Sequence, residues 1–184
     1  MPQPLPVPPM TAAIRPATRD DAPALAEAQV AAWHATYPGM VPPPMLEAMT
    51  VARRAPLWVR ILEAGQSVTL VSEAGGLTGF VSVGAQRTER HKATYAGEIY
   101  ALYIHPEAQG QGHGAALMRA GAARLRAAGH GAASLWVMSG NARARRFYEH
   151  LGGALLEEQT VPVEGGSFDE VAYGWRDLSP LAGK

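Results

Sequence analysis

The hydrophobic pattern of the chain changes most sharply between residues 98 and 117. Residues 99–104 are a short apolar run rich in β-forming side chains, too brief for a buried helix, so they predict a strand that Pro106 ends. Further on, apolar residues recur at helical spacing until Gly129, which marks the end of a helix. The expected inward stripe of this helix consists of Leu117, Gly121, Leu125 and Ala128. We therefore expect a strand, a turn and a helix in immediate succession.

Upstream of this stretch, the pattern predicts a first strand, three helices and a hairpin. Thr18, followed three positions later by Asp21, predicts a capping box that opens the first helix. The third helix should turn Leu57 and Ile61 inward and end at Gly65. The expected elements are a strand at residues 12–17, helices at 23–34, 44–49 and 51–63, and hairpin strands at 67–73 and 77–85.

Downstream, the chain predicts a second strand beside the first one and then a closing hairpin. Residues 132–138 are apolar and should run parallel to residues 99–104, because a helix joins the two strands in a right-handed crossover. By contrast, residues 87–92 are charged, which predicts a solvated and mobile loop. The other expected elements are a helix that Asn141 opens, with Ala144, Tyr148 and Leu151 on one side, and strands at 154–163 and 170–175 around a glycine turn.

Composition narrows the class of protein. A chain of 184 residues without cysteine buries one core without disulfides, so we expect a single domain at residues 12–184. Residues 1–11 contain five prolines and should form a disordered, extended tail. The 16 acidic and 16 basic residues balance, so we expect no nucleic-acid partner and no binding to an anionic membrane. The sequence shows no signal-peptide pattern and no apolar run long enough to span a membrane, so we expect a cytoplasmic location.

The turn between the central strand and its helix carries three glycines at alternate positions, Gly110, Gly112 and Gly114. A strand, a glycine turn and a helix present bare backbone N–H groups and a positive helix end to an anion. A phosphate ligand is therefore expected. The alternative is a glycine-rich turn that binds nothing.

Three kinds of phosphate loop fit this turn to different degrees. A Walker loop fails, because Gly114 is followed by alanines where Lys and Ser or Thr are required. A dinucleotide fingerprint is satisfied in letters by Gly110, Gly112 and Ala115, but the next strand ends without the acid that should bind the ribose. The third interpretation takes Gln109-x-x-Gly112-x-Gly114 as the signature. It resembles the pyrophosphate loop of the GNAT superfamily of acyl-CoA N-acyltransferases.

The resemblance continues through residues 141–152, NARARRFYEHLG, which are similar to a second landmark of that superfamily. It implies an α/β (α+β) fold with a mixed, mostly antiparallel sheet that is splayed between two parallel strands and flanked by helices. Acetyl-CoA is the implied acetyl donor, and no metal is expected. The implied cofactor-binding residues are Leu102, Tyr103 and Ile104 for pantetheine, Gln109, Gly110, Gln111, Gly112, His113, Gly114 and Ala115 for pyrophosphate, and Asn141 and Arg145.

Several of these residues have a plainer alternative. His113 could point at the ligand, but an exposed turn residue is the commoner case. Many members of the superfamily carry Arg where this chain has Gln109, so the loop depends more on backbone dipoles. Arg145 shares a helix with Arg143 and Arg146, and we expect one of the three to meet the 3′-phosphate of coenzyme A.

Acyl transfer from a thioester to an amine needs a neutral nucleophile and a proton for the departing thiolate. Tyr148 is the candidate acid, since it lies seven residues after Asn141 on the same helical face. The alternative is a core tyrosine whose hydroxyl bonds to the backbone. Glu98, at the head of the central strand, is the candidate base, directly or through water. The alternative there is a solvated acid at a strand end.

Trp33 and Tyr37 are the candidate acceptor-binding residues. They belong to a segment that prolines and a glycine break while bulky side chains stay crowded together, which predicts either a wall of an acceptor pocket or a loop packed on the core. We expect the acceptor to be a small-molecule amine. A protein or peptide N-terminus, or a non-catalytic acyl-CoA sensor, are the alternatives. We also expect a homodimer, formed through the terminal hairpin and the region of Trp175.

Overall fold

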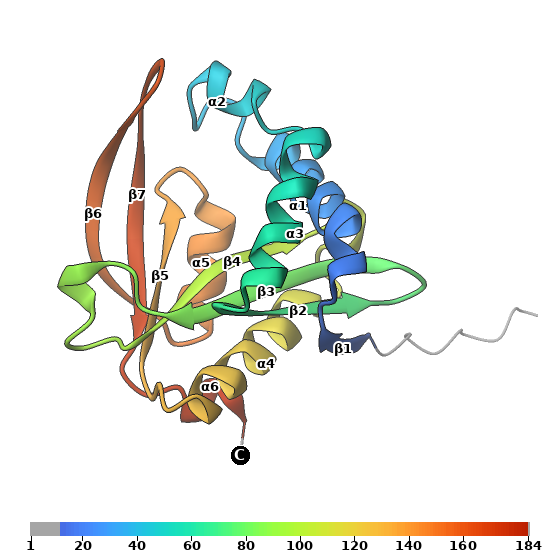
Figure 1. The fold of residues 1–184 in the computed structure, drawn as a ribbon. Coiled ribbons are helices and arrows are strands. Elements are labelled where there is room, and N and C mark those ends of the chain that lie inside the picture. The colour runs from blue at the N-terminus through green and yellow to red at the C-terminus, as the bar shows by residue number, and fades with distance from the viewer. Residues whose placement is uncertain (1–11, 184) are drawn as a thin grey trace, which may run out of the picture.

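Residues 12–183, the part of the chain that the computed structural model describes, are built around one seven-stranded sheet (Figure 1). Its strand order is β1-β2-β3-β4-β5-β7-β6. The strands are β1 (Ala13–Pro16), β2 (Ser67–Glu73), β3 (Leu77–Ala85), β4 (Gly97–Ile104), β5 (Ala133–Met138), β6 (Ala154–Val163) and β7 (Gly166–Trp175). The helices are α1 (Ala22–Thr36), α2 (Pro43–Glu47), α3 (Val51–Ala64), α4 (His113–Ala127), α5 (Ala142–His150) and α6 (Ser179–Ala182), with 3₁₀ turns η1 (Arg19–Asp21), η2 (Glu89–His91) and η3 (Pro106–Ala108).

The two central strands of this sheet, β4 and β5, run parallel and pair over a very short length. Gly97 is opposite Ala133 and Glu98 is opposite Ser134, and the pairing stops there. All the other neighbouring strands are antiparallel. The predicted fold class, a mostly antiparallel mixed sheet that opens between two parallel strands, is therefore confirmed.

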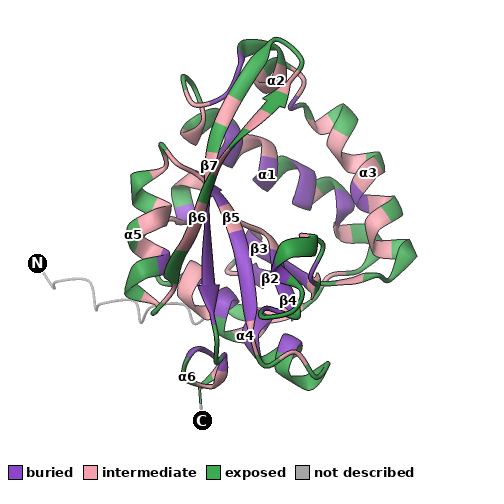
Figure 2. Ribbon diagram, turned by 90° about the vertical axis from the view of Figure 1, so that its left-hand side faces the viewer, coloured by how far each residue is buried: buried purple, intermediate pink, exposed green. Residues whose placement is uncertain are grey.

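Helices cover both faces of the sheet. Because successive strand residues face opposite sides, Phe80 and Val81 of β3 belong to different cores. On the first face, Phe80 packs with Leu25 of α1 and Trp58 of α3. On the second face, Val81 packs with Leu117 of α4, and α5 joins the same cluster. Figure 2 shows β5 buried between these layers while the outward faces of α3 and α5 are exposed.

Local sequence signals place several elements where they were expected. The hairpin strands β2 and β3 have the predicted bounds. The Asn141 side chain accepts a hydrogen bond from the Ala144 amide at 3.1 Å and caps α5. The capping box of Thr18 and Asp21 is also present, but it opens η1, and α1 begins directly after it at Ala22.

Two details of the predicted packing and one predicted strand boundary are wrong. The buried residue of α3 is Trp58, and Ile61 contacts the same cluster while the neighbouring Leu57 does not. Ala128 is exposed at the end of α4, because the helix stops before a full further turn is made. The last strand is longer than expected: β7 starts at Gly166, since the glycine turn is tight enough for pairing to begin at once.

The charged segment at residues 87–92 is solvent-exposed for the most part, as its composition predicts, with His91 as the exception. The side chain of His91 is buried, with Nδ1 3.2 Å from the Ser134 hydroxyl and Nε2 2.6 Å from the Glu157 carboxylate. Its ring also stacks on Trp136. Arg87 forms an ion pair with Glu98. These partners of His91 and Arg87 lie on strands outside the segment, which a local composition argument cannot see.

The expected tail at residues 1–11 lies outside the described residues. Within residues 12–183, no helix has the length and apolar character needed to cross a membrane.

Candidate active site

The divergence of β4 and β5 leaves one edge of β4 without a strand partner beyond Glu98. Backbone N–H and C=O groups on that edge need other partners or a ligand. One is accounted for, since the carbonyl of Ile104 accepts a hydrogen bond from the Gln109 side chain at 3.2 Å. The rest of the edge, around Leu102 and Tyr103, borders two cavities.

The larger of the two, called here the loop cavity, has a volume of about 690 Å³. Its lining combines the end of β4, the glycine loop, the first turn of α4 and the start of α5. The sequence-predicted residues that it brings together are Tyr37, Leu102, Tyr103, Ile104, Gln109, Gly110, Gly112, His113, Gly114, Ala115, Asn141 and Tyr148. Gln111 and Arg145 do not line it.

Two glycines of the loop are required by backbone conformation. Gly110 has φ +79° and Gly112 has φ +88°, a left-handed region that strains other residues. A Cβ on Gly114 would make an ordinary contact of 3.4 Å with the Phe147 ring, so packing does not require a glycine there. Gly112 is the N-cap of α4, and none of the described side chains caps the first amides of that helix. These amides are free to bind an anion.

His113 differs from both alternatives considered for it. Its side chain is buried, and its Nδ1 lies 3.1 Å from the Ser72 hydroxyl on β2. It is therefore not an exposed turn residue. It borders the loop cavity while its ring is anchored to the sheet, so it fixes the start of α4 in place.

One arginine of α5 reaches the glycine loop, and it is not the one expected. The guanidinium of Arg143 donates to the Gln109 side chain, and both residues line the loop cavity. Arg145 instead donates to the Ser139 carbonyl at 3.1 Å and to the Tyr173 hydroxyl at 3.3 Å. Of these two arginines, Arg143 and not Arg145 therefore lines the loop cavity. It also restores a positive charge beside Gln109.

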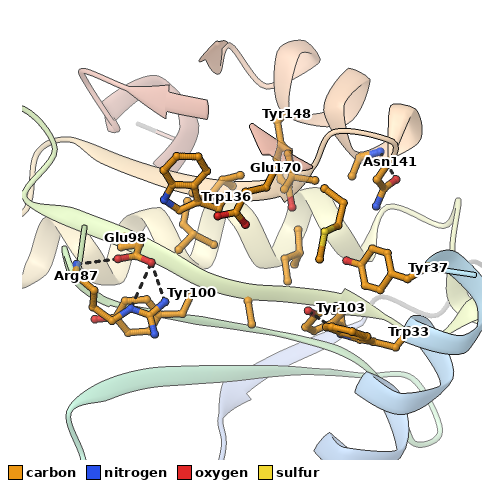
Figure 3. A pocket seen from close by; sticks show the side chains of 17 residues that line it. Trp33, Tyr37, Arg87, Glu98, Tyr100, Tyr103, Trp136, Asn141, Tyr148 and Glu170 are labelled. Atoms are coloured by element: carbon orange, nitrogen blue, oxygen red, sulfur yellow. Dashed lines mark hydrogen bonds and ion pairs between the residues drawn. The ribbon is translucent and has the colours of Figure 1, made fainter. Parts of the chain in front are cut away.

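The second cavity, called here the carboxylate cavity, has a volume of about 320 Å³ and lies at the start of the opening between β4 and β5 (Figure 3). Glu98 enters it from β4 and is only 4% exposed. Its carboxylate accepts hydrogen bonds from the backbone amide and the guanidinium of Arg87, both at 2.7 Å. Glu98 is thus a buried, oriented acid and not a solvated residue at a strand end.

A second acid in this cavity was missed by the sequence. Glu170 of β7 lines it, with Gln159 donating to its carboxylate at 2.7 Å. Nothing in the chain marked Glu170, because the antiparallel pairing of β7 with β5 is what brings it to the opening.

Trp33 and Tyr37 reach the site from α1 and the residue that follows it. The Trp33 indole donates to the Tyr103 hydroxyl at 2.9 Å, and its ring meets Tyr37 edge to face. Both residues line the carboxylate cavity, and Trp33 also packs in a small core with Val41 and Met49. The two alternatives for this segment, cavity wall and core packing, are therefore both realised.

Tyr148 of α5 lies where the two cavities meet. It lines both of them and is 7% exposed. Among residues 12–183 its hydroxyl has no hydrogen-bond partner, and Figure 3 shows it directed into the opening. Tyr148 is thus a core residue, as the alternative held, but its hydroxyl is not bonded to the backbone.

Burial raises the pKa of the Tyr148 phenol, and the neighbouring Tyr103 hydroxyl raises it further. Burial likewise raises the pKa of Tyr37 and of Tyr103. All three phenols are therefore neutral near pH 7 and able to donate a proton.

A sheet opened between two parallel strands, with an anion loop on one side of a protonated tyrosine and two carboxylates on the other, defines an enzyme of the acyltransferase class. Residues 28–153 match the model of the acetyltransferase (GNAT) family, and the chain belongs to that family. The resemblance seen in the sequence is confirmed.

Similar proteins cover almost the whole chain. The uncharacterised N-acetyltransferase YuaI of Bacillus subtilis (strain 168) is 32% identical over 168 residues, which are 91% of this chain and 95% of that protein. A GCN5-related N-acetyltransferase from Rhodopseudomonas palustris has a similar fold, with a TM-score of 0.71 and 22% identity over 89% of this chain and 94% of that one. The yncA protein of Salmonella typhimurium, solved with its cofactor acetyl-CoA, has a TM-score of 0.69 and 23% identity over 92% and 95%.

Proposed function

We propose that this protein transfers an acetyl group from acetyl-CoA to a primary amine of a small molecule while both substrates are bound, in a single domain at residues 12–184. One observation carries the proposal: the loop cavity and the carboxylate cavity adjoin at Tyr148. The lining residues that they share are Tyr37, Leu102, Tyr103, Asn141, Ala144 and Tyr148. A donor in the first cavity and an acceptor in the second would meet beside one phenol.

The loop cavity suits coenzyme A in its chemistry. The free amides of the loop and of the first turn of α4, together with Arg143, would bind the pyrophosphate. The unpaired edge of β4 would bind the amides of pantetheine as a missing strand would. The similarity to yncA, whose structure holds acetyl-CoA, supports the same donor here. The thioester, when bound, supplies the activated acetyl group.

Tyr148 would protonate the departing sulfur. Its hydroxyl has no competing partner among residues 12–183, and burial keeps it protonated. Glu98 would remove a proton from the acceptor ammonium, directly or through water, so that the neutral amine attacks the carbonyl carbon. As the C–N bond forms and the C–S bond breaks, the thiolate would take the phenol proton of Tyr148, and the second proton of the amine would pass through water to the resulting phenolate. Glu98 would release the first proton to solvent after the products leave.

The size of the carboxylate cavity favours a small acceptor over a peptide. Its volume of about 320 Å³ suits a small molecule. The free Tyr148 hydroxyl favours an enzyme over an acyl-CoA sensor.

The test is an assay of coenzyme A release with a panel of primary amines. We expect release to depend on the amine, and initial rates at several fixed amine concentrations to give intersecting double-reciprocal lines, as a ternary complex requires. Parallel lines would indicate a covalent acetyl-enzyme and would contradict direct transfer. Absence of acetyl-CoA binding in calorimetry would overturn the donor assignment.

We also propose a cytoplasmic homodimer. The Trp175 side chain itself would contribute little to its surface, because Trp175 is buried in the core and donates to the Leu151 carbonyl. The better candidate is β6, an edge strand of the sheet on which Leu155 is 56% exposed. Sedimentation of the wild type and of Leu155→Lys tests this, since only the wild type should exceed the monomer mass of 19.5 kDa.

A further inference from the structure

A third cavity, called here the arginine cavity, adjoins the carboxylate cavity across β4. It has a volume of about 600 Å³ and lies between α3 and the strands β2 to β4. The two cavities share the lining residues Arg87, Tyr100, Ala101 and Tyr103. The two cavities are therefore neighbours, and these four residues form a common wall.

The lining of the arginine cavity contains three cations and no acid. Arg87 is neutralised by Glu98, and Arg60 is exposed. Arg54 is half-buried, and no carboxylate among residues 12–183 forms an ion pair with it. Burial lowers the pKa of Arg54, so its charge is held partly out of water without a partner. Uncompensated charges of this kind are costly and tend to mark binding sites.

The Arg54 guanidinium is held in one orientation by Gln29. The Gln29 side chain, 5% exposed, accepts a hydrogen bond from Arg54 Nε at 3.0 Å and another from the Trp58 indole at 2.9 Å. Both terminal nitrogens of Arg54 are left without a partner among the described residues. A guanidinium fixed through Nε with its terminal nitrogens free is preorganised to bind an oxyanion through two hydrogen bonds.

The two ends of the acceptor side therefore differ in charge. Glu98 and Glu170 both line the carboxylate cavity, and because Arg87 neutralises only one of these two charges, an ammonium would still be attracted there. Arg54 lies on the far side of β4, and an anion would be attracted there. We propose that the acceptor is an amine that also carries an anionic group, a carboxylate or a phosphate, and that Arg54 binds this group while the amine lies beside Glu98. The inference rests on the proposed acetyl transfer and specifies its substrate class.

Matched acceptors test the wild type without any variant. Each pair has the same amine with and without the anion: the common amino acids against their amides, and phosphoethanolamine against ethanolamine. We expect the anionic member of each active pair to have a kcat/KM at least tenfold higher, mainly through a lower KM. The two sets of pairs show whether the preferred group is a carboxylate or a phosphate. The preference should shrink as salt is added, since an ion pair is screened.

Variants then assign the preference to one side chain. Arg54→Gln removes the charge and should reduce the preference for the anionic member to threefold or less, and Arg54→Lys should restore part of it. Arg53→Gln is the matched control, because Arg53 is the exposed neighbour on α3 and lines none of these cavities. It should keep the wild-type preference.

Three results would overturn the inference. Equal kcat/KM for the two members of every active pair would do so, as would an Arg54→Gln variant with the wild-type preference. Turnover of neutral amines alone, by a protein that binds acetyl-CoA, would also reject it while leaving acetyl transfer in place. If acetyl-CoA itself did not bind, the proposed function would fail first.

Discussion

The proposed donor side and the proposed acceptor side of this enzyme are built in different ways. The glycine loop that borders the loop cavity is one continuous segment from the end of β4 to the start of α4, and residues from α1 and α5 complete the lining. The carboxylate and arginine cavities use side chains from α1, α3, β4 and β7, which the sheet brings together from distant positions.

This contrast has a chemical reason. A phosphate can be bound by main-chain N–H groups, whose positions depend on local φ and ψ angles and therefore on glycines. An acceptor must be distinguished from other amines by charge and shape, which only side chains supply. The donor side should therefore be sensitive to backbone changes and the acceptor side to single functional groups.

The largest effect is expected for Gly112→Val. A β-branched residue cannot adopt φ +88° without strain, so the amides of the loop should move out of register with the phosphates. Acetyl-CoA affinity measured by calorimetry should fall by roughly 100-fold or more, about 2.7 kcal/mol. Gly129→Val is the matched control, since Gly129 has φ +86° at the other end of α4. It should lose similar stability and keep its affinity. An unchanged affinity in a folded Gly112→Val protein would contradict the backbone account.

The next effect is expected for Tyr148→Phe. Its hydroxyl has no partner to lose among residues 12–183, so stability and acetyl-CoA affinity should persist while kcat at saturating acceptor falls by about 100-fold, the usual scale for a positioned acid. Tyr173→Phe is the control: Tyr173 is fully buried, and its hydroxyl is bonded to Glu149 and Arg145. That variant should lose about 1 kcal/mol of stability and keep its kcat. A Tyr148→Phe enzyme with normal kcat would make water the proton donor.

The two carboxylates should differ in a smaller but measurable way. Glu98→Gln keeps the shape and can still accept the Arg87 amide, yet it cannot take a proton, so kcat/KM should fall by roughly 10- to 100-fold near neutral pH. Glu170→Gln should cost about fivefold or less in kcat/KM, as expected for a group that attracts the ammonium without accepting its proton. If Glu170→Gln lost more kcat/KM than Glu98→Gln, Glu170 would be the base and Glu98 the group that attracts the ammonium. Steady-state rates from pH 6 to 9 would show the difference.

The smallest effect is expected on stability, at Asp21, which lines none of the three cavities. Arg15 holds the pKa of Asp21 at about 2, aided by the Thr18 groups. The pKa of Asp21 is lower in the folded state than in the unfolded state. Ionised Asp21 therefore adds to the free energy of unfolding above the unfolded pKa near 4, and this contribution is lost as the pH falls toward 2. Asp21→Asn should cost about 1 kcal/mol at pH 7, because the pair is partly exposed, and the difference should shrink between pH 4 and 2.

Denaturant unfolding at pH 7, 4 and 3 measures this change, with Asp20→Asn as the control. Asp20 is the exposed neighbour in the same turn. Both variants should keep their acetyl-CoA affinity. A loss of acetyl-CoA affinity in Asp21→Asn would show that residues outside the cavities also control donor binding, which would contradict the contrast drawn above.

The same division decides what the sequence could predict. The glycine loop, the Asn141 cap and the hairpin of β2 and β3 each depend on residues that are close together in the sequence, and the sequence predicted all three. The strand-and-helix pattern around them also predicted the two parallel strands, and the family resemblance implied the opening between them. These features depend on local dihedral angles and on alternation, which a sequence displays directly.

The rest depends on pairing between distant strands. Glu170 reaches the site only because β7 lies beside β5, and His91 is buried only because Ser134 and Glu157 are on strands that flank it. Arg143 and Arg145 are two positions apart on α5, and which of them meets the loop is decided by packing. Side-chain direction on short helices and charge pairing across a sheet leave no local trace.

The short pairing of β4 with β5 also bears on how the molecule unfolds. Backbone hydrogen bonding across the middle of the sheet is limited to the pairs of Gly97 with Ala133 and Glu98 with Ser134. We therefore expect β1 to β4 and β5 to β7 to open as two cooperative units, which one apolar core under α4 holds together. A ligand lying along the free edge of β4 would join these units. Binding of the donor should therefore couple the opening of the two units. The amide protons of both units should then exchange with solvent more slowly when acetyl-CoA is bound than when it is absent.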